Sequence, residues 1–184
     1  MGQKGEQTRA RLVAAALDLI ESGGCSAAGL NQVIAASGAP KGSLYFHFPG
    51  GKDQLVEEAV RQGGAEISRL LGELPADDAA GLLTGLLEVL GERMEASGWR
   101  KGCPVATVAL ETAAENAALQ RACSEVYRSW EDGLAALLEA EGHPAPGETA
   151  SSVLALVEGA LMLSRAHHSR EPLEKAARTI ALLL

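Results

Sequence analysis

Apolar residues recur at helical spacing along almost the whole of this 184-residue chain. The first such stripe includes Leu12, Ala16 and Ile20, and residues spaced in this way give a helix one apolar face. Phe, Trp and Tyr occur only twice each, whereas strands favour aromatic and β-branched residues. We therefore expect an all-α protein with about nine helices and no strand.

Glycine pairs and prolines divide this pattern into helices of two sizes. Three short helices are expected within about residues 6–46, and six longer ones follow. Gly23 and Gly24 predict the end of the first helix. Gly63 and Gly64 fall inside the first long helix, which they are expected to weaken by about 1 kcal/mol each.

The expected division is a three-helix N-terminal domain, residues 1–50, and a larger helical domain, residues 51–184. The charge distribution follows this division. The net charge of the chain is −8, but residues 1–52 hold five Lys or Arg against three Asp or Glu. That is a net charge of +2, which leaves −10 for the rest. A basic N-terminal part on an acidic protein is compatible with binding an anion at that end.

Composition restricts the class of protein further. About 47% of the residues are hydrophobic and 22% are charged, which is the range of globular domains. Cys25, Cys103 and Cys123 form an odd set without CxxC spacing, which indicates a reducing cytoplasm. The N-terminus is polar, and no apolar run reaches the roughly 20 residues that span a bilayer. We expect a cytoplasmic protein with no membrane partner.

One stretch, SGAPKGSLYFHFPGGK, combines lysines with half of the chain's aromatic side chains. A short helical segment at residues 29–35 precedes it, Gly38 lies in a turn at 36–39, and Pro40 can open a second short helix. Two short helices joined by a tight glycine-containing turn are typical of a helix-turn-helix.

The segment GLNQVIAASGAPKGSLYFHFPGGKDQL, Gly29–Leu55, resembles the DNA-binding head of the tetracycline-repressor (TetR) family. The resemblance covers about residues 6–60. The segment GCPVATVALE, Gly102–Glu111, is similar to the LmrA/YxaF-like branch of that family. One departure is Ala28, because the family usually has Thr or Ser there, opening the first helix of the motif and often bonding phosphate.

The resemblance and the side-chain chemistry together predict a DNA-contacting set. Lys41 and Lys52 offer charged donors to phosphate oxygens, and Gly42 lets backbone approach a surface closely. Leu44 and Phe48 are expected to face inward. The predicted contacts with double-stranded operator DNA are Asn31, Pro40, Lys41, Gly42, Ser43, Tyr45, His47 and Lys52.

The resemblance also implies a homodimeric repressor that a small, apolar effector releases from DNA. The effector-binding candidates share aromatic rings or sulfur atoms: Met94, Trp99, Cys103, Tyr127, Trp130 and Met162. The dimer candidates lie on the last two apolar segments: Leu154, Leu161, Leu173 and Ile180. No cofactor is expected, and no metal site, because His167, His168 and Glu171 lack further ligands at suitable spacing.

Two other classes of function are alternatives. One is a helical small-molecule-binding or scaffold protein that has lost DNA binding. The other is an enzyme on a helical bundle, but neither a GxSxG elbow nor a phosphate-binding loop is present. Activation in place of repression also remains an alternative.

Overall fold

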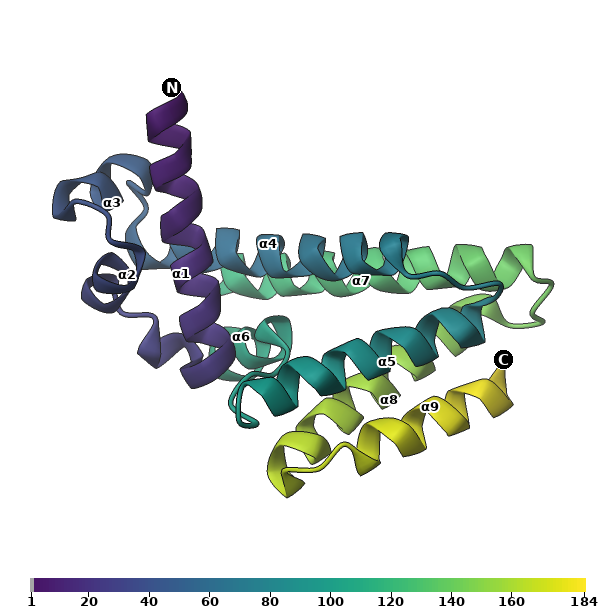
Figure 1. The fold of residues 1–184 in the computed structure, drawn as a ribbon. Helices are drawn as coiled ribbons and strands as arrows, with labels where there is room; N and C mark the ends of the chain where they lie inside the picture. Colours follow the sequence, from purple (N-terminus) through teal and green to yellow (C-terminus); the bar gives the residue numbers. More distant parts are fainter. Residues whose placement is uncertain (1) are drawn as a thin grey trace. The chain divides into compact units, whose positions relative to one another are not determined.

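The computed structural model describes residues 2–184, and these residues form nine helices and no strand, which confirms the expected fold class (Figure 1). The helices are α1 (Gln3–Ala27), α2 (Leu30–Ser37), α3 (Lys41–His47), α4 (Gly51–Glu73), α5 (Ala79–Ala96), α6 (Pro104–Thr112), α7 (Ala117–Ala140), α8 (Pro146–His167) and α9 (Glu171–Leu183). In the described part of the chain, no helix combines the length and the apolar character needed to cross a membrane.

The first helix is longer than the sequence predicts. It continues past Gly23 and Gly24 to Ala27, with 25 residues in all. Gly24 has φ 77° and ψ −177°, which are not helical values, so the glycine pair produces a kink rather than an end. A positive φ of this size strongly favours glycine.

The chain packs as two compact units. One unit holds the residues up to Ala65 together with Pro104–Val126, and the other holds Glu66–Cys103 together with Tyr127–Leu184. Helices α4 and α7 contribute to both. The first unit extends beyond residue 50 because α6 packs against α1. The functional division at residues 1–50 and 51–184 stays a prediction.

Helix α1 is the common packing partner in the first unit, where it contacts α2, α3 and α6. Its apolar stripe is buried, with Leu12 at 0% and Leu17 at 5% exposure. Leu44 and Phe48, at the two ends of the last turn of α3, are both fully buried. The expectation that these two side chains face inward is therefore confirmed.

Gly63 and Gly64 lie at a close packing contact inside α4. A Cβ atom added to Gly64 would lie 2.5 Å from Val126 Cγ1, and one added to Gly63 would lie 3.0 Å from Pro104 Cγ. The pair lowers the intrinsic helix propensity of α4, as the sequence predicts. It also allows Val126 of α7 and Pro104, the first residue of α6, to approach the α4 backbone.

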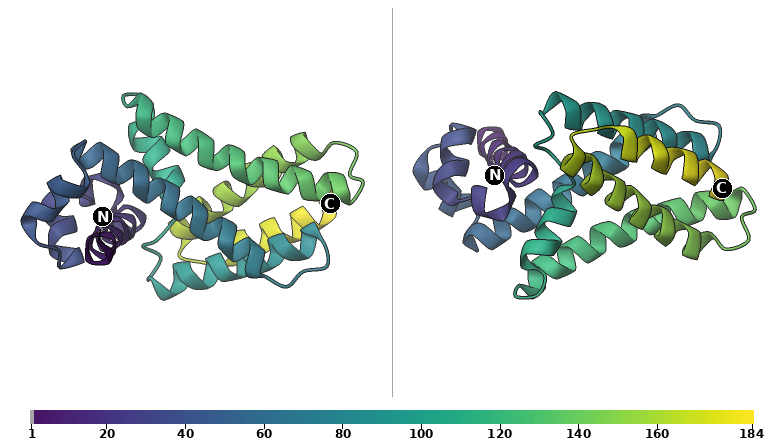
Figure 2. Two further views of the ribbon diagram at one scale, coloured as in Figure 1. Left: turned by 90° about the horizontal axis from the view of Figure 1, so that it is seen from above. Right: turned by 90° about the horizontal axis from the view of Figure 1, so that it is seen from below.

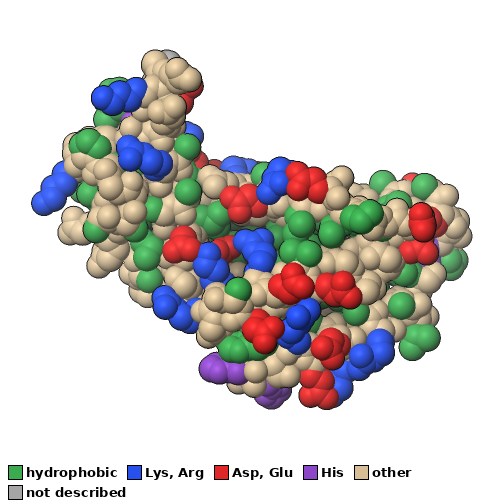
Figure 3. All heavy atoms as spheres, viewed as in Figure 1, with side chains coloured by type: hydrophobic (Ala, Val, Ile, Leu, Met, Phe, Trp, Pro, Cys, Tyr) green, Lys and Arg blue, Asp and Glu red, His purple; other side chains and the backbone are tan. Residues whose placement is uncertain are grey.

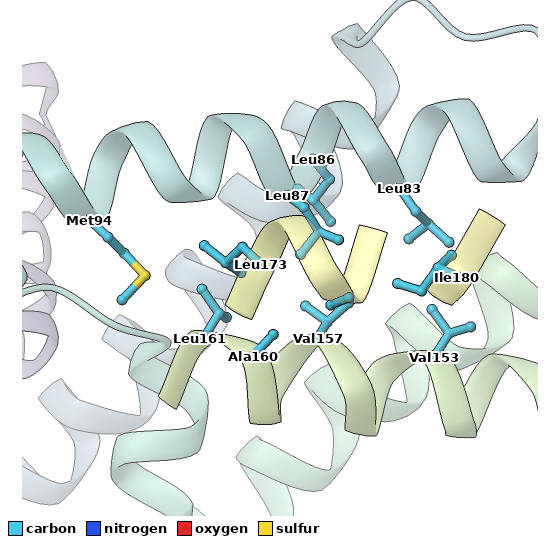
Figure 4. Packing of buried hydrophobic residues seen from close by; sticks show 11 residues of the cluster. Leu83, Leu86, Leu87, Met94, Val153, Val157, Ala160, Leu161, Leu173 and Ile180 are labelled. Carbon is cyan, nitrogen blue, oxygen red and sulfur yellow. The ribbon is translucent and has the colours of Figure 1, made fainter. Parts of the chain in front are cut away.

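The second unit is built on α5, α8 and α9, which lie side by side (Figure 2). Their facing side chains form one apolar cluster (Figure 4). Its buried members are Leu83, Leu86, Leu87, Met94, Val153, Val157, Ala160, Leu161, Leu173, Ala176 and Ile180. A smaller cluster of Ala79, Leu138 and Ala150 adds α7 to this unit.

Three of the four dimer candidates belong to this cluster. Leu161, Leu173 and Ile180 are 7%, 2% and 0% exposed, so they pack inside their own protomer. The apolar periodicity of α8 and α9 predicted a buried stripe on each helix. Periodicity does not show whether the same protomer or a second copy covers such a stripe, and here the same protomer does. Leu154 is half-buried. The large exposed apolar side chains of the same two helices are Met162, Leu163, Leu182 and Leu183.

Glu158 stands in the apolar middle of α8 and is partly buried. Burial raises the pKa of its carboxyl group above the ordinary value of 4.5. Hydrogen bonds donated by the Cys103 thiol and the Tyr127 phenol act in the opposite direction. A carboxyl group in such surroundings holds its proton to a higher pH than an exposed one.

We predict that Gly64→Ala destabilises the protein by about 1–3 kcal/mol, because the new methyl group overlaps Val126. Gly133→Ala in α7 is the matched control. Nothing lies within 4 Å of a Cβ at Gly133, so this variant should gain up to about 1 kcal/mol from helix propensity. Urea unfolding measures both. Equal stabilisation by the two substitutions would contradict the close contact.

A second prediction concerns pH. The native state holds the Glu158 proton more tightly than the unfolded state, so this residue favours folding at low pH. That contribution is lost as the pH rises from 4.5 through the raised native pKa. Glu158→Gln should therefore gain in unfolding free energy relative to the wild type as the pH rises above 4.5. Glu139→Gln, at an exposed position of the same unit, is the control for removing one carboxylate charge.

Candidate nucleic-acid interface

The turn between α2 and α3 is closed by local hydrogen bonds. Gly38 caps α2 with φ 62° in the left-handed region, which suits a residue without a side chain. The Ala39 N–H donates to Ser37 Oγ at 3.2 Å, and Ser43 Oγ donates to the Pro40 carbonyl at 2.6 Å. These bonds fix the direction in which α3 leaves the turn.

Helix α3 presents two different faces. Leu44 and Phe48 anchor one face, whereas Tyr45 and Phe46 on the other face are 63% and 72% exposed. Lys41 is exposed at the start of the same helix. In Figure 3, Lys and Arg side chains project from the surface of α1–α3, and Asp and Glu are sparse on that visible face. This combination of exposed cations and aromatic rings is suited to phosphate and groove contacts.

The structure brings five of the eight predicted DNA contacts to the surface. Asn31, Pro40, Lys41, Gly42 and Tyr45 are exposed. The remaining three are placed differently, and each has a physical reason.

Ser43 and His47 are engaged within the motif. Ser43 is half-buried, and its hydroxyl donates to Pro40 as described. His47 is 9% exposed, its ring lies edge-on to Phe46 at 5.0 Å, and its buried Nδ1 has no hydrogen-bond partner. The sequence predicted His47 as a DNA contact because its ring can donate to phosphate oxygens, but the helix turns the ring inward.

Lys52, in the first turn of α4, is hydrogen-bonded to the backbone of α1. Its Nζ donates to the Cys25 carbonyl at 2.6 Å, and its side chain is partly buried.

The Cys25 N–H donates to Glu111 Oε2 at 2.8 Å. Burial, with a smaller contribution from Glu111, raises the pKa of the Cys25 thiol to about 11. Sequence reasoning missed Glu111, because no local pattern connects it to a residue 86 positions away.

Arg9 is a further residue that sequence reasoning missed. Its guanidinium lies over the Phe48 ring, 5.4 Å from the centroid, and it forms an ion pair with Glu58 of α4. A cation over an aromatic face is attracted by the ring quadrupole. Arg9 and Glu58 also line a surface crevice of about 670 Å³ between α1 and α4. Arg9 thus links the end of α3 to both neighbouring helices.

Ala28 stands where the family that the sequence resembles usually has Thr or Ser. It is fully buried at the end of α1, and α2 is capped by Gly29 without any side-chain hydrogen bond. The nearby Ser26 hydroxyl donates to the Gly23 carbonyl.

The effector candidates are all in the second unit, but they do not form one group. Met94 is buried, and Trp99 and Cys103 are partly buried against the same apolar cluster. Met162 is 63% exposed and is not part of that lining. Met162 was selected for its sulfur atom, and side-chain chemistry does not distinguish the inner from the outer face of α8.

Aromatic side chains meet in two places in this unit. Tyr127 and Trp130 make an edge-to-face contact at 5.7 Å, and Trp99 stacks on His168 at 6.2 Å. Glu158 accepts a hydrogen bond from Tyr127, which places a polar group beside this otherwise apolar set. Within residues 2–184, no three His, Cys, Asp or Glu side chains form a group able to hold a metal ion.

Comparison with known proteins agrees with this geometry. A model of bacterial regulatory proteins of the tetR family matches residues 12–59, and one of the C-terminal domain of LmrA/YxaF-like transcriptional regulators matches residues 79–179. The chain is 35% identical over 182 residues to the HTH-type transcriptional regulator LmrA of Bacillus subtilis, with 96% of each protein covered. It is 33% identical to an uncharacterized HTH-type transcriptional regulator of Mycobacterium tuberculosis, covering 96% of this chain and 93% of that one.

A TetR transcriptional regulator from Legionella pneumophila has the same fold in its crystal structure. The TM-score is 0.84 at 20% identity, over 100% of this chain and 98% of the other. The two family models together cover most of the chain, and the curated relatives cover nearly all of it. The chain belongs to the TetR family of transcriptional regulators, with a C-terminal domain of the LmrA/YxaF-like kind.

Proposed function

We propose that this TetR-family regulator represses transcription as a homodimer on operator DNA and is released by a small effector. The observation that carries the proposal is the orientation of α3. Leu44 and Phe48 hold it on the first unit by one face, while Lys41 and Tyr45 stand exposed on the other. An exposed cation and an exposed ring beside a glycine fit a duplex groove.

The proposed contacts divide by chemistry. Lys41 and Tyr45 donate to phosphate oxygens, and exposed Gly42 allows the backbone to come close to the DNA. Asn31, at the start of α2, supplies a further polar group. A seven-residue helix reads only a few base pairs, so two copies are required. Two heads about 34–36 Å apart would read successive major-groove faces of a near-palindrome.

The exposed apolar residues of α8 and α9 support the proposed dimer. Met162 and Leu182 are 63% and 88% exposed, and large exposed apolar side chains on neighbouring helices favour a self-complementary contact. Two helices from each protomer would then form a four-helix interface.

The second unit is the proposed site of the effector. Trp99 and Cys103 pack beside Met94, and rings with sulfur atoms suit an apolar molecule. Glu158 adds one carboxyl group that accepts hydrogen bonds from neutral donors. An effector that carries an N–H or O–H group beside an apolar body would match these residues.

The direct test is to select bound fragments from genomic DNA with the purified protein, and then to screen compounds that release them. Transcription from a recovered fragment in the presence of the protein should fall, and rise again with the releasing compound. An increase in transcription would identify an activator. The absence of any salt-sensitive binding at low ionic strength would support the alternative of a helical binding protein that has lost DNA binding.

The two lysines give a prediction about DNA binding. Lys41→Ala should weaken binding to every duplex and lower the slope of log K against log[salt] by about 0.9, the contribution of one phosphate contact. Lys52→Met should weaken binding without changing the slope, because the Lys52 amine bonds the Cys25 carbonyl. Fluorescence titrations over a range of salt measure both slopes. An unchanged slope for Lys41→Ala would remove it from the phosphate contacts.

The dimer gives another prediction. Met162→Glu combined with Leu182→Glu should produce monomers, because two charges would be buried in an apolar contact at a cost of several kcal/mol. Leu110→Glu is the control, since Leu110 is 83% exposed but lies on α6. Sedimentation velocity reports the mass of each variant. A dimer that persists in the double variant would place the interface elsewhere.

A further inference from the structure

The kink in α1 leaves one backbone N–H without its regular helical partner. In an undistorted helix the Cys25 N–H would donate to the carbonyl four residues earlier. Gly24, with φ 77° and ψ −177°, breaks that register. The Cys25 N–H donates instead to Glu111 Oε2 of α6 at 2.8 Å. A side chain from a distant helix therefore takes the place of a helical hydrogen bond.

The carboxylate of Glu111 fits the kink closely. A Cβ atom added to Gly24 would lie 2.1 Å from Glu111 Oε1. Both carboxylate oxygens therefore face the bend, one accepting from Cys25 and the other filling the space beside Gly24. Glycine is required at this position for two separate reasons, the positive φ and the approach of Glu111.

The carbonyl of the same residue is held from the other side. Lys52 Nζ, on α4, donates to the Cys25 carbonyl at 2.6 Å. Next to Lys52, Asp53 Oδ2 accepts from Asn116 Nδ2 at 2.8 Å. The N–H and the carbonyl of Cys25 are thus hydrogen-bonded by side chains of opposite charge, Glu111 of α6 and Lys52 of α4. Hydrogen bonds to charged groups are shorter and stronger than neutral ones.

Only four residues separate Cys25 from the first residue of α2. They include Ala28, which is fully buried, and Gly29, which caps α2. Such a short connection transmits a change of direction at Cys25 to α2, and α2 packs on α3. The hydrogen bonds at Cys25 therefore influence the direction in which the exposed face of α3 points.

We propose that Glu111 is a positioning residue for DNA binding: together with Lys52 it holds the Cys25 backbone and so orients the helix-turn-helix. The proposal rests on the function proposed above, because it assumes that α3 reads DNA. Glu111 itself lies outside the motif and touches no residue of α3 in the contacts described.

The direction in which DNA affinity changes when Glu111 is removed distinguishes the positioning role from a simple effect of its charge. A carboxylate in the DNA-binding unit repels phosphate, so its removal should strengthen binding if charge were its only influence. A positioning carboxylate behaves in the opposite way, because its removal frees Cys25 and lets α2 and α3 turn away from the productive orientation. Glu115, an exposed residue just after α6, supplies the matched charge without the contact to Cys25.

The experiment compares the full-length wild type with Glu111→Ala, Glu111→Gln and Glu115→Ala. The probes are a duplex recovered from genomic DNA by the wild type and a scrambled duplex of the same length. Glu111→Ala should bind the recovered duplex about tenfold more weakly, within the range of effects transmitted through packed networks, and the scrambled duplex equally well. Glu111→Gln keeps an acceptor for the Cys25 N–H and should recover part of the loss. Glu115→Ala should bind both duplexes as tightly as the wild type or more tightly.

A second measurement tests the contact itself and does not depend on DNA. The pKa of the Cys25 thiol is raised to about 11 by burial and then by Glu111. Glu111→Gln removes the negative charge with little change in shape, so Cys25 should be alkylated faster near pH 9, while the rate at Cys123 stays the same. Peptide mass mapping follows each cysteine separately.

The outcomes are distinct. If the wild type binds no DNA, the proposed function fails, and faster alkylation of Cys25 shows only that the contact exists. If the wild type binds and Glu111→Ala binds the recovered duplex equally well or better, the positioning role is overturned while the function stands. A parallel loss on the recovered and scrambled duplexes, or no recovery in Glu111→Gln, also overturns it, because a loss of folded protein would give that pattern.

Discussion

The burial of one stripe of α1 is the constraint on which the first unit depends. Leu12, Ala16 and Ile20 are fully buried, and the helix that carries them contacts α2, α3 and α6. A motif of two short helices cannot bury enough apolar surface to be stable alone. It keeps its shape because Leu44 and Phe48 close onto α1, leaving the opposite face of α3 free for another molecule.

The features set by local pattern could be predicted from the sequence. The helical class, the turn at Gly38 and the inward side chains Leu44 and Phe48 all follow from spacing and turn chemistry. The kink at Gly24 could not, because a glycine pair ends one helix and bends another depending on what the following residues meet. Here they meet Glu111, which comes from a distant part of the chain.

The same limit applies to the direction in which a helical side chain points. His47 follows the exposed pair at 45 and 46 but is buried, and Ile180 has the apolar character of an interface residue but packs inside the protomer. Periodicity shows that a helix has an apolar face. It does not show whether that face packs against the same chain or against a second copy, since either partner would exclude water from it.

A Cβ atom added to Gly64 would overlap the Val126 side chain. The two positions therefore share a fixed volume, and natural or selected variants should trade size between them instead of changing independently. A methyl group gained at position 64 has to be compensated by a smaller, unbranched side chain at position 126. Sequence variation at this contact would follow the summed volume of the two side chains, in the way that paired core positions exchange bulk.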